Sequence, residues 1–331
     1  MKISVVVPVY NAETWIEETL ESVRQQGNEI EIILVDDGSR DRSVEVARAF
    51  LDRYGLSGQV LTSDENQGAS SARNLGWRNA TAEWIQFLDA DDLLAPEKFR
   101  IQYAAAESAP ENVAVLYSPW QHIAQLGGKW SPTGTVVRSD VDRDAVSRIL
   151  EDRLYGYVGP TLVRRRALDA IDGFSPQMSL GEDLDLMLRL AMAGYKFQLV
   201  SSANPLFLYR DTPNSLWQRS AVDSSAVTQL VLSVREAEVH LRAAGYARLS
   251  ESTKGAIAAR YAERLDVLQF DDPDNFNRVL QWISDLHLRS APPGSPLPAR
   301  LVAMVVGLGN ALRLRFAIRG VLRSLRSSFA K

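Results

Sequence analysis

The feature that most constrains the fold is an alternation, over the first 90 residues, of short apolar runs with amphipathic segments. The apolar runs are residues 3–7, 30–35, 60–62 and 84–88. The segments between them, such as 12–26 and 70–79, place apolar side chains at helical spacing. This order predicts βαβ units with right-handed crossovers, and therefore an α/β fold with a mostly parallel sheet.

Polar loops follow the predicted strands, where a parallel sheet binds its ligands. They read PVYN at 8–11, DDGS at 36–39 and DADD at 89–92. The last places three carboxylates within four residues, and these repel one another unless a divalent cation with oxygen ligands neutralises them. Each motif has an alternative reading, because acids often cap helices and Asp-Gly is an ordinary turn.

The choice of metal ligands is narrow. The chain has no cysteine and only three histidines, His122, His240 and His287. Disulfides, thiolate metal sites and cysteine nucleophiles are excluded, and a multi-histidine centre is disfavoured. Any hard cation has to be held by carboxylates.

The second half of the chain continues the α/β pattern less regularly. Strands are expected at 113–117, 161–163 and 196–200, helices at 144–154, 166–171 and 182–193, and a loop region from the first of these strands to about 140.

Six motifs in one order resemble family 2 of the inverting glycosyltransferases, which have the GT-A fold. They are ISVVVPVYN, LVDDGSRD, ENQGASSARN, FLDADD, GPTLVRRRALDAIDGF and GEDLDLMLRLAMAGYKF. The resemblance covers residues 1–212. It implies a Rossmann-like, mostly parallel central sheet flanked by helices, with a catalytic domain at 1–219. Residues 1–112 would form the nucleotide-sugar donor half and residues 113–219 the acceptor half.

The resemblance also implies a donor site. In it, Tyr10 packs on the base and Asp37 accepts a hydrogen bond from it. The alternatives are that Tyr10 is a core aromatic at a strand end and that Arg73 is an exposed helix arginine. The cation, Mn²⁺ or Mg²⁺, would be held by Asp89, Asp91 and Asp92 and would bridge the diphosphate. The implied donor-binding residues are Pro8, Tyr10, Asn11, Asp36, Asp37, Ser39, Gly68, Arg73, Asn74, Asp89, Ala90, Asp91 and Arg210.

On the acceptor side, the resemblance implies that Asp183 is the base that deprotonates the acceptor hydroxyl, with Gly159 and Glu182 beside it. The acids open a predicted helix, where free N–H groups stabilise a carboxylate; the alternative is that they are ordinary first-turn acids. The chain departs from the pattern at Leu184, where relatives often have tryptophan, and at Thr212, where relatives often have histidine.

The resemblance implies an inverting, metal-dependent enzyme that moves one sugar from a nucleotide-diphosphate sugar, UDP-sugar being favoured. The acceptor would be a hydroxyl of a glycan or lipid-linked molecule, in surface polysaccharide or glycoconjugate synthesis. The QxxRW signature of processive synthases is absent. One alternative is a sugar-1-phosphate nucleotidyltransferase, which would need a Gly-rich, Arg-containing loop where this chain has residues 8–11. The other is a non-catalytic sugar-nucleotide-binding or scaffold protein, which the complete set of acids disfavours.

The length of 331 residues suggests about two domains. The C-terminal part differs from the remainder of the chain in its charge. The net charge is −4, which argues against a nucleic-acid partner. Eight basic and no acidic residues follow Asp285. We expect a helical region at 220–290, a Pro-rich linker at 291–298 and a basic amphipathic helix at 299–331.

The last predicted helix carries an apolar stripe, from Leu314 to Phe329, flanked by four arginines. Such a helix suits an anionic membrane surface; the alternative is that the stripe packs on the acidic body or on a second subunit. The N-terminus has no signal-peptide pattern and no apolar run approaches about 20 residues. We therefore expect a cytoplasmic chain, held peripherally at the inner face of the plasma membrane if this helix binds lipid.

Overall fold

The structure is a computed structural model. It describes residues 2–27, 29–137, 145–151, 157–178, 180–212, 224–243 and 272–286, together with 254–255, 257–258, 261 and 268. The chain folds as two compact units, Met1–Ser215 and Leu216–Lys331.

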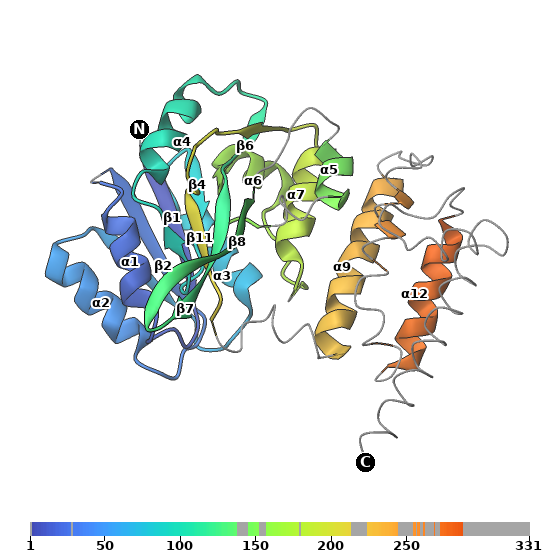
Figure 1. The fold of residues 1–331 in the computed structure, drawn as a ribbon, viewed down its shortest axis with the longest axis horizontal. Coiled ribbons are helices and arrows are strands. Elements are labelled where there is room, and N and C mark those ends of the chain that lie inside the picture. The colour runs from blue at the N-terminus through green and yellow to red at the C-terminus, as the bar shows by residue number, and fades with distance from the viewer. Residues whose placement is uncertain are drawn as a thin grey trace, which may run out of the picture. The chain divides into compact units, whose positions relative to one another are not determined.

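A seven-stranded sheet forms the centre of the first unit (Figure 1). Its order is β10-β6-β9-β4-β1-β2-β3, and only the two pairings of β9, with β4 and β6, are antiparallel. The predicted mostly parallel sheet is therefore confirmed. The strands are β1 (Ile3–Val9), β2 (Ile30–Asp36), β3 (Gly58–Thr62), β4 (Trp84–Phe87), β6 (Val113–Tyr117), β9 (Thr161–Arg164) and β10 (Lys196–Leu199).

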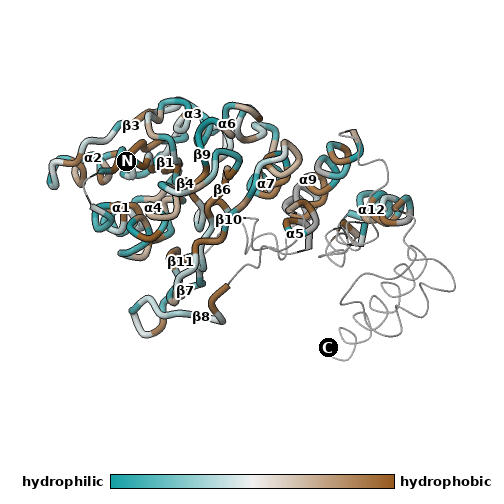
Figure 2. The backbone as a smooth tube through the Cα atoms, turned by 90° about the horizontal axis from the view of Figure 1, so that it is seen from above, coloured by the Kyte–Doolittle hydropathy of each residue, from teal (hydrophilic) through white to brown (hydrophobic). Residues whose placement is uncertain are grey.

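Helices cover both faces of this sheet. Alternate residues of β1, such as Val5, share one core with Leu20 of α1 and Phe99 of α4. On the other face α3 lies so close that a Cβ added at Gly76 would be 2.3 Å from a methyl carbon of Val6. Figure 2 shows α3 and α6 on the opposite side of the sheet from α1 and α4. The helices are α1 (Ile16–Arg24), α2 (Ser43–Tyr54), α3 (Ala69–Asn79), α4 (Lys98–Ser108), α5 (Ala145–Glu151), α6 (Arg165–Ile171) and α7 (Glu182–Met192).

A second sheet corrects the expected loop region up to residue 140. Its order is β5-β11-β7-β8, formed by β5 (Leu93–Leu94), β11 (Phe207–Arg210), β7 (Trp120–Leu126) and β8 (Lys129–Val137). The signal for the hairpin β7–β8 is Gly127-Gly128, two residues with φ of 60° and 79° that form a tight hairpin turn. The sequence interpretation took these glycines as loop markers only.

The first helix also begins later than predicted. The pattern suggested a start at Ala12, whereas α1 begins at Ile16. The turn before α1 is held by side chains at the start of α2 and in the loop before it. The Ala12 N–H donates to Ser43 Oγ at 2.7 Å, and the Glu13 N–H donates to Asp41 Oδ2 at 3.0 Å.

The second unit contains the helices α9 (Ser224–Ala243) and α12 (Pro273–Asp285), so its described part is helical, as the pattern indicates. Buried Glu238 joins it together: it accepts a hydrogen bond from Tyr261 at 2.6 Å and pairs with Arg235 and Arg242. The predicted linker 291–298 and basic helix 299–331 lie outside the described residues. Among the helices that the structure describes, none has the length and apolar character needed to cross a bilayer.

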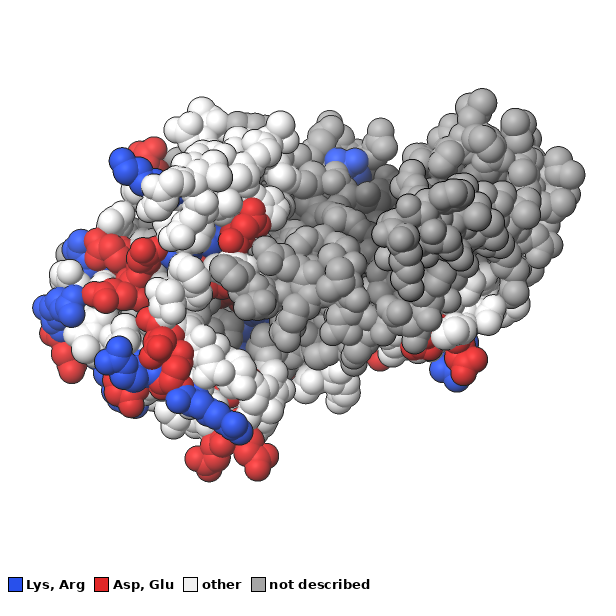
Figure 3. All heavy atoms as spheres, turned by 60° about the horizontal axis from the view of Figure 1, so that its bottom comes forward, with Lys and Arg blue, Asp and Glu red and all other residues white. Residues whose placement is uncertain are grey.

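Surface charges contribute little to this fold. On the face drawn in Figure 3, basic and acidic side chains of the described residues lie interspersed. Exposed pairs such as Arg53–Glu17, 2.8 Å apart, are screened by solvent and contribute little to stability. The apolar cores on both faces of the sheet therefore supply most of the stability, and they hold in place the loops that follow β1, β2 and β4.

Candidate functional site

The loops after β1 and β2 are tied together by polar contacts. Asn11 has a φ of +49°, unusual for a residue other than glycine. Its N–H donates to Ser39 Oγ at 3.0 Å, and its Oδ1 accepts the Arg40 N–H at 2.8 Å. Two of the predicted donor residues, Asn11 and Ser39, thus fix one another at the carboxyl edge of the sheet.

The Asp36-Asp37 loop is closed against the segment that precedes α3. The buried carboxylate of Asp37 accepts the N–H groups of Gln67 and Gly68, each at 2.8 Å. A Cβ at Gly38 would lie 3.1 Å from the Asn66 nitrogen, and φ at Gly38 is +77°. Glycine is therefore needed at position 38, where the two chain segments approach each other closely. The predicted hydrogen bond from Asp37 to a base stays a prediction.

Tyr10 projects from this edge and is 49% exposed. The alternative that it is a core aromatic is therefore wrong. Because its ring is open to solvent beside the two tied loops, a planar base could stack on it.

The acidic loop after β4 gathers three carboxyl groups, two of which are partly or fully buried. The side chain of Asp89 is 42% exposed, whereas the residue Asp92 is only 3% exposed. Burial raises the pKa of Asp91, and the neighbouring Asp89 raises it further. Burial, with the charges of Asp91 and Asp89, raises the pKa of Asp92 well above its usual range. A nearby cation would relieve this cost.

A divalent cation fits Asp89 and Asp91 better than Asp92. The Asp92 carboxylate faces the protein and accepts the Arg210 N–H at 2.9 Å. In the part of the chain that the structure describes, no three His, Asp or Glu side chains converge as a complete metal cage. The predicted ligation by Asp92 stays a prediction with weaker geometric support.

Arg73 is buried and paired with carboxylates of two separate segments of the chain. Its side chain is 3% exposed, so the alternative of an exposed helix arginine is wrong. It donates to Asp89 Oδ1 at 2.7 Å and to Glu182 Oε1 at 2.8 Å. The surrounding carboxylates hold its pKa well above the usual range despite burial. Arg73 joins the acidic loop to the N-terminus of α7, and its predicted donor contact stays a prediction.

Asp183 has the environment of a base. Its Oδ2 accepts the Val158 N–H at 3.1 Å, while its Oδ1 is buried without a hydrogen-bond partner and lies 3.6 Å from Arg73 Nη1. Burial raises the pKa of Asp183 to about 8, against the attraction of Arg73. A carboxyl group with such a pKa keeps its proton at neutral pH, but once it is deprotonated it is a stronger base than an ordinary carboxylate.

The loop that contacts Asp183 is rigidly held. The Gly159 carbonyl accepts Gln86 Nε2 at 2.8 Å, and the Pro160 carbonyl accepts the Ser118 hydroxyl at 2.8 Å. A Cβ at Gly159 would lie 2.3 Å from the ring of Phe207. Gly159, predicted on the acceptor side, therefore allows the close packing that places the Val158 N–H.

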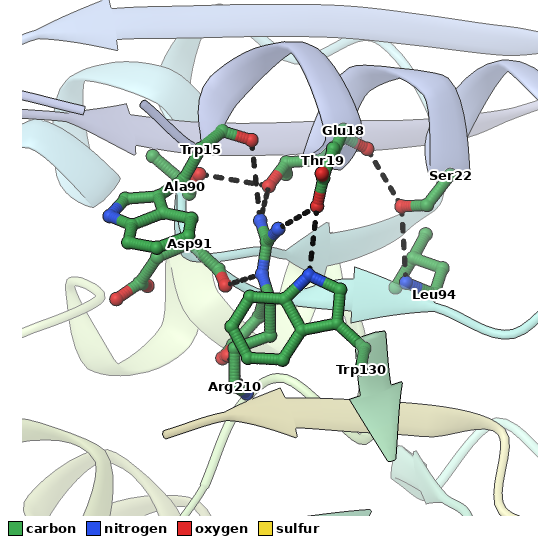
Figure 4. Close-up of polar contacts among 10 residues, drawn as sticks. Trp15, Glu18, Thr19, Ser22, Ala90, Asp91, Leu94, Trp130 and Arg210 are labelled. Atoms are coloured by element: carbon green, nitrogen blue, oxygen red, sulfur yellow. Dashed lines mark hydrogen bonds and ion pairs between the residues drawn. The ribbon is translucent and has the colours of Figure 1, made fainter. Parts of the chain in front are cut away.

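Arg210 lies in a closed cage instead of facing an open donor site (Figure 4). Its side chain is 0% exposed and donates to Glu18 Oε2 at 2.6 Å and Thr19 Oγ1 at 2.7 Å. The rings of Trp15 and Trp130 lie 5.5 and 5.4 Å from its guanidinium carbon. This placement favours a structural role over the predicted phosphate contact.

Asn74 also lies in the core. Its Nδ2 donates to the Phe174 carbonyl at 2.7 Å, and its Oδ1 accepts Trp77 Nε1 at 2.9 Å. These bonds indicate that Asn74 connects α3 to the Phe174 main chain, and they favour this structural role over the predicted donor contact. The remaining predicted residues lie where the motifs place them: Pro8 in β1, Asp36 at the end of β2, Gly68 before α3, Ala90 in the acidic loop and Glu182 at the start of α7.

Sequence reasoning missed the cage around Arg210 and the contact of Thr212, whose hydroxyl donates to Asp91 Oδ2 at 2.9 Å. Trp15 and Glu18 were visible only as parts of a helix, and Trp130 lay in a presumed loop. The one available signal was the position of Thr212, two residues beyond Arg210.

Comparison with known sequences shows consistent similarity. The pattern of Glycosyl transferase family 2 matches residues 4–171. The minor teichoic acid biosynthesis protein GgaA of Bacillus subtilis is 28% identical over 238 residues, which are 69% of this chain and 52% of that protein. The uncharacterized glycosyltransferase EpsJ of the same organism is 29% identical, over 65% of this chain and 62% of that protein. The chain thus spans about half to three fifths of these relatives.

Solved structures share the fold. Staphylococcus aureus TarS 1-349 in complex with UDP-GlcNAc has a TM-score of 0.64 at 18% identity, covering 99% of this chain and 92% of that one. The mannosyltransferase PcManGT of Pyrobaculum calidifontis, in complex with GDP-Man and Mn²⁺, has a TM-score of 0.57 at 18% identity, covering 97% and 87%. The α/β architecture is therefore that of the GT-A glycosyltransferases.

Proposed function

The chain belongs to glycosyl transferase family 2, and on this premise we propose that it transfers one sugar, with inversion, from a nucleotide-diphosphate sugar to an acceptor hydroxyl. The observation that carries the proposal is Asp183, a buried carboxyl group with a free oxygen and a pKa raised to about 8. Arg73 connects it to the acidic loop that would face the donor diphosphate.

The donor would bind at the carboxyl edge of the sheet. The exposed ring of Tyr10 offers a stacking surface for the base, and the loop with Asp36, Asp37 and Ser39 forms the wall beside it. UDP is favoured as the nucleotide because TarS, which shares the fold, binds UDP-GlcNAc. GDP is the alternative, since PcManGT binds GDP-Man.

Mn²⁺ or Mg²⁺, held by Asp89 and Asp91, would supply positive charge to the leaving diphosphate. The chain's own residues do the remainder. Arg73 offsets the charge of Asp89 and orients Glu182. The Val158 N–H fixes Asp183 Oδ2, so that Oδ1 is the oxygen that takes the proton of the acceptor hydroxyl as that hydroxyl attacks the anomeric carbon.

The acceptor is proposed to be a glycan or lipid-linked molecule of a surface polysaccharide. The support is the similarity to GgaA, a minor teichoic acid biosynthesis protein. Contact with an anionic membrane through residues 299–331 would bring such an acceptor to the site. The same contact would hold the protein peripherally at the cytoplasmic face of the membrane.

The test is a panel of UDP-, GDP- and dTDP-sugars with Mn²⁺, Mg²⁺ or EDTA, in the presence of membrane lipid extract. We expect nucleoside diphosphate release with one donor and a divalent cation, and NMR of the product should show an inverted anomeric configuration. A parallel assay supplies a nucleoside triphosphate and a sugar 1-phosphate, and release of pyrophosphate there would instead identify a nucleotidyltransferase. Nucleotide binding without release by any donor would identify a non-catalytic protein.

A further inference from the structure

The end of β11 is connected to the acidic loop by three contacts. The Arg210 N–H donates to Asp92 Oδ1 at 2.9 Å, and Arg210 Nε donates to the Asp91 carbonyl. The Thr212 hydroxyl donates to Asp91 Oδ2 at 2.9 Å. Only the third contact reaches the carboxylate of Asp91, and it occupies one of the two oxygens.

Thr212 is itself held in a fixed place. It is 3% exposed, and its N–H donates to the Arg210 carbonyl at 2.9 Å. The preceding residue, Asp211, donates its N–H to the Ile123 carbonyl of β7 at 2.9 Å. The side chain of Arg210, enclosed by two tryptophan rings in Figure 4, ties this strand end to α1 through its bonds to Glu18 and Thr19. The hydroxyl of Thr212 thus approaches Asp91 from a rigid frame.

We propose that Thr212 is a positioning residue that orients the Asp91 carboxylate toward the divalent cation. This inference rests on the proposed function, in which Asp91 is a ligand. A carboxylate turns about its Cβ–Cγ bond with little resistance, and a hydrogen bond to one oxygen directs the other. Hydrogen bonds of this kind behind a ligand typically change metal affinity 10–100-fold when they are removed. Thr212 thereby acts through Asp91.

The experiment measures Mn²⁺ binding to the full chain by electron paramagnetic resonance, with and without UDP, so that no turnover is required. Thr212→Val keeps the shape and removes the hydroxyl, and Thr212→Ser keeps the hydroxyl. Thr133→Val is the matched control, because the Thr133 hydroxyl, in the same sheet, donates to Asp211 Oδ2 at 3.4 Å and not to the acidic loop. We expect Thr212→Val to weaken Mn²⁺ binding about 10-fold or more, and the other two variants to stay close to the unsubstituted chain.

Either of two binding results overturns the inference and leaves the proposed function standing: unchanged Mn²⁺ affinity in Thr212→Val, or an equal loss in Thr133→Val. Thermal melting of each variant checks the fold, and Thr212→Ala serves as a second hydroxyl deletion if the valine is not accommodated. Unfolding of both deletions would assign Thr212 to the fold and also overturn the inference. Absence of Mn²⁺ binding by the unsubstituted chain is a different result, because it removes the cation from the proposed function itself.

Discussion

Replacing Asp183 by asparagine should remove transfer and at the same time stabilise the protein. The carboxyl group is buried beside Glu182 and Asp89, and Arg73, the one cation paired with it among the described residues, also pairs with both. Asparagine keeps the shape and can still accept the Val158 N–H, but it carries no charge and cannot take a proton. We expect turnover to fall about 10²–10⁴-fold while nucleotide affinity is kept.

The gain in stability follows from the pKa of Asp183, about 8 in the folded chain against an ordinary value of 3.8. Between these values the folded state holds a proton that the unfolded state has lost, so the free energy of unfolding falls as pH rises. At pH 7 the difference is about three pH units, or about 4 kcal/mol at ~1.4 kcal/mol per unit. Because asparagine still buries a polar group without a second partner, we expect about half, about 2 kcal/mol.

Urea denaturation at pH 5 and pH 8 measures this effect, together with turnover on the donor identified by the panel. The stability difference between Asp183→Asn and the unsubstituted chain should be larger at pH 8 than at pH 5. Asp185→Asn is the control: its buried carboxylate accepts Arg189 Nε at 2.8 Å and the Ser175 hydroxyl at 2.9 Å, so its loss should destabilise by about 3 kcal/mol. A less stable Asp183→Asn, a gain independent of pH, or retained turnover would refute the reasoning.

The remaining predictions concern the same site and the C-terminal region. Asp91→Asn should abolish activity, and EDTA should do the same to the unsubstituted enzyme; full activity in EDTA would contradict the cation role. The value of kcat/KM should rise with pH through about 8, because Asp183 must lose its proton to act as a base; a flat profile from pH 6 to 9 would speak against it. Gly159→Ala should destabilise by about 1–3 kcal/mol and lower turnover, because its Cβ would lie 2.3 Å from the Phe207 ring; unchanged melting and kinetics would show that the loop has room. The full chain should co-sediment with anionic liposomes and a chain ending before Pro292 should not; equal binding by both, or no preference over neutral lipid, would leave only the packing role for the helix predicted at 299–331.

Patterns that are local in sequence predicted most of the architecture. Strands such as Ile3–Val9 are built from short, mostly apolar runs, and the acidic loop closely follows one of them, so periodicity and chain order were sufficient. The contacts of Arg73 were not accessible in this way, because its partners Asp89 and Glu182 lie 16 and 109 positions away. Which of several acids meets a given arginine depends on the packing of α3 against the sheet, and no spacing rule encodes that.

The cage around Arg210 has a consequence for the growing chain on the ribosome. Its bonds reach back to residues of α1, across 191 and 192 positions in the sequence. Contacts of such long range form late. The acidic loop leaves the exit tunnel long before β11. The Thr19 hydroxyl of α1 can already bond to the Ala90 carbonyl, but the bonds of Arg210 to Asp91 and Asp92 form only when β11 docks. A nascent chain shorter than about 210 residues would therefore expose clustered carboxylates in an unfinished loop, and capture of a cation would mark the completion of the domain.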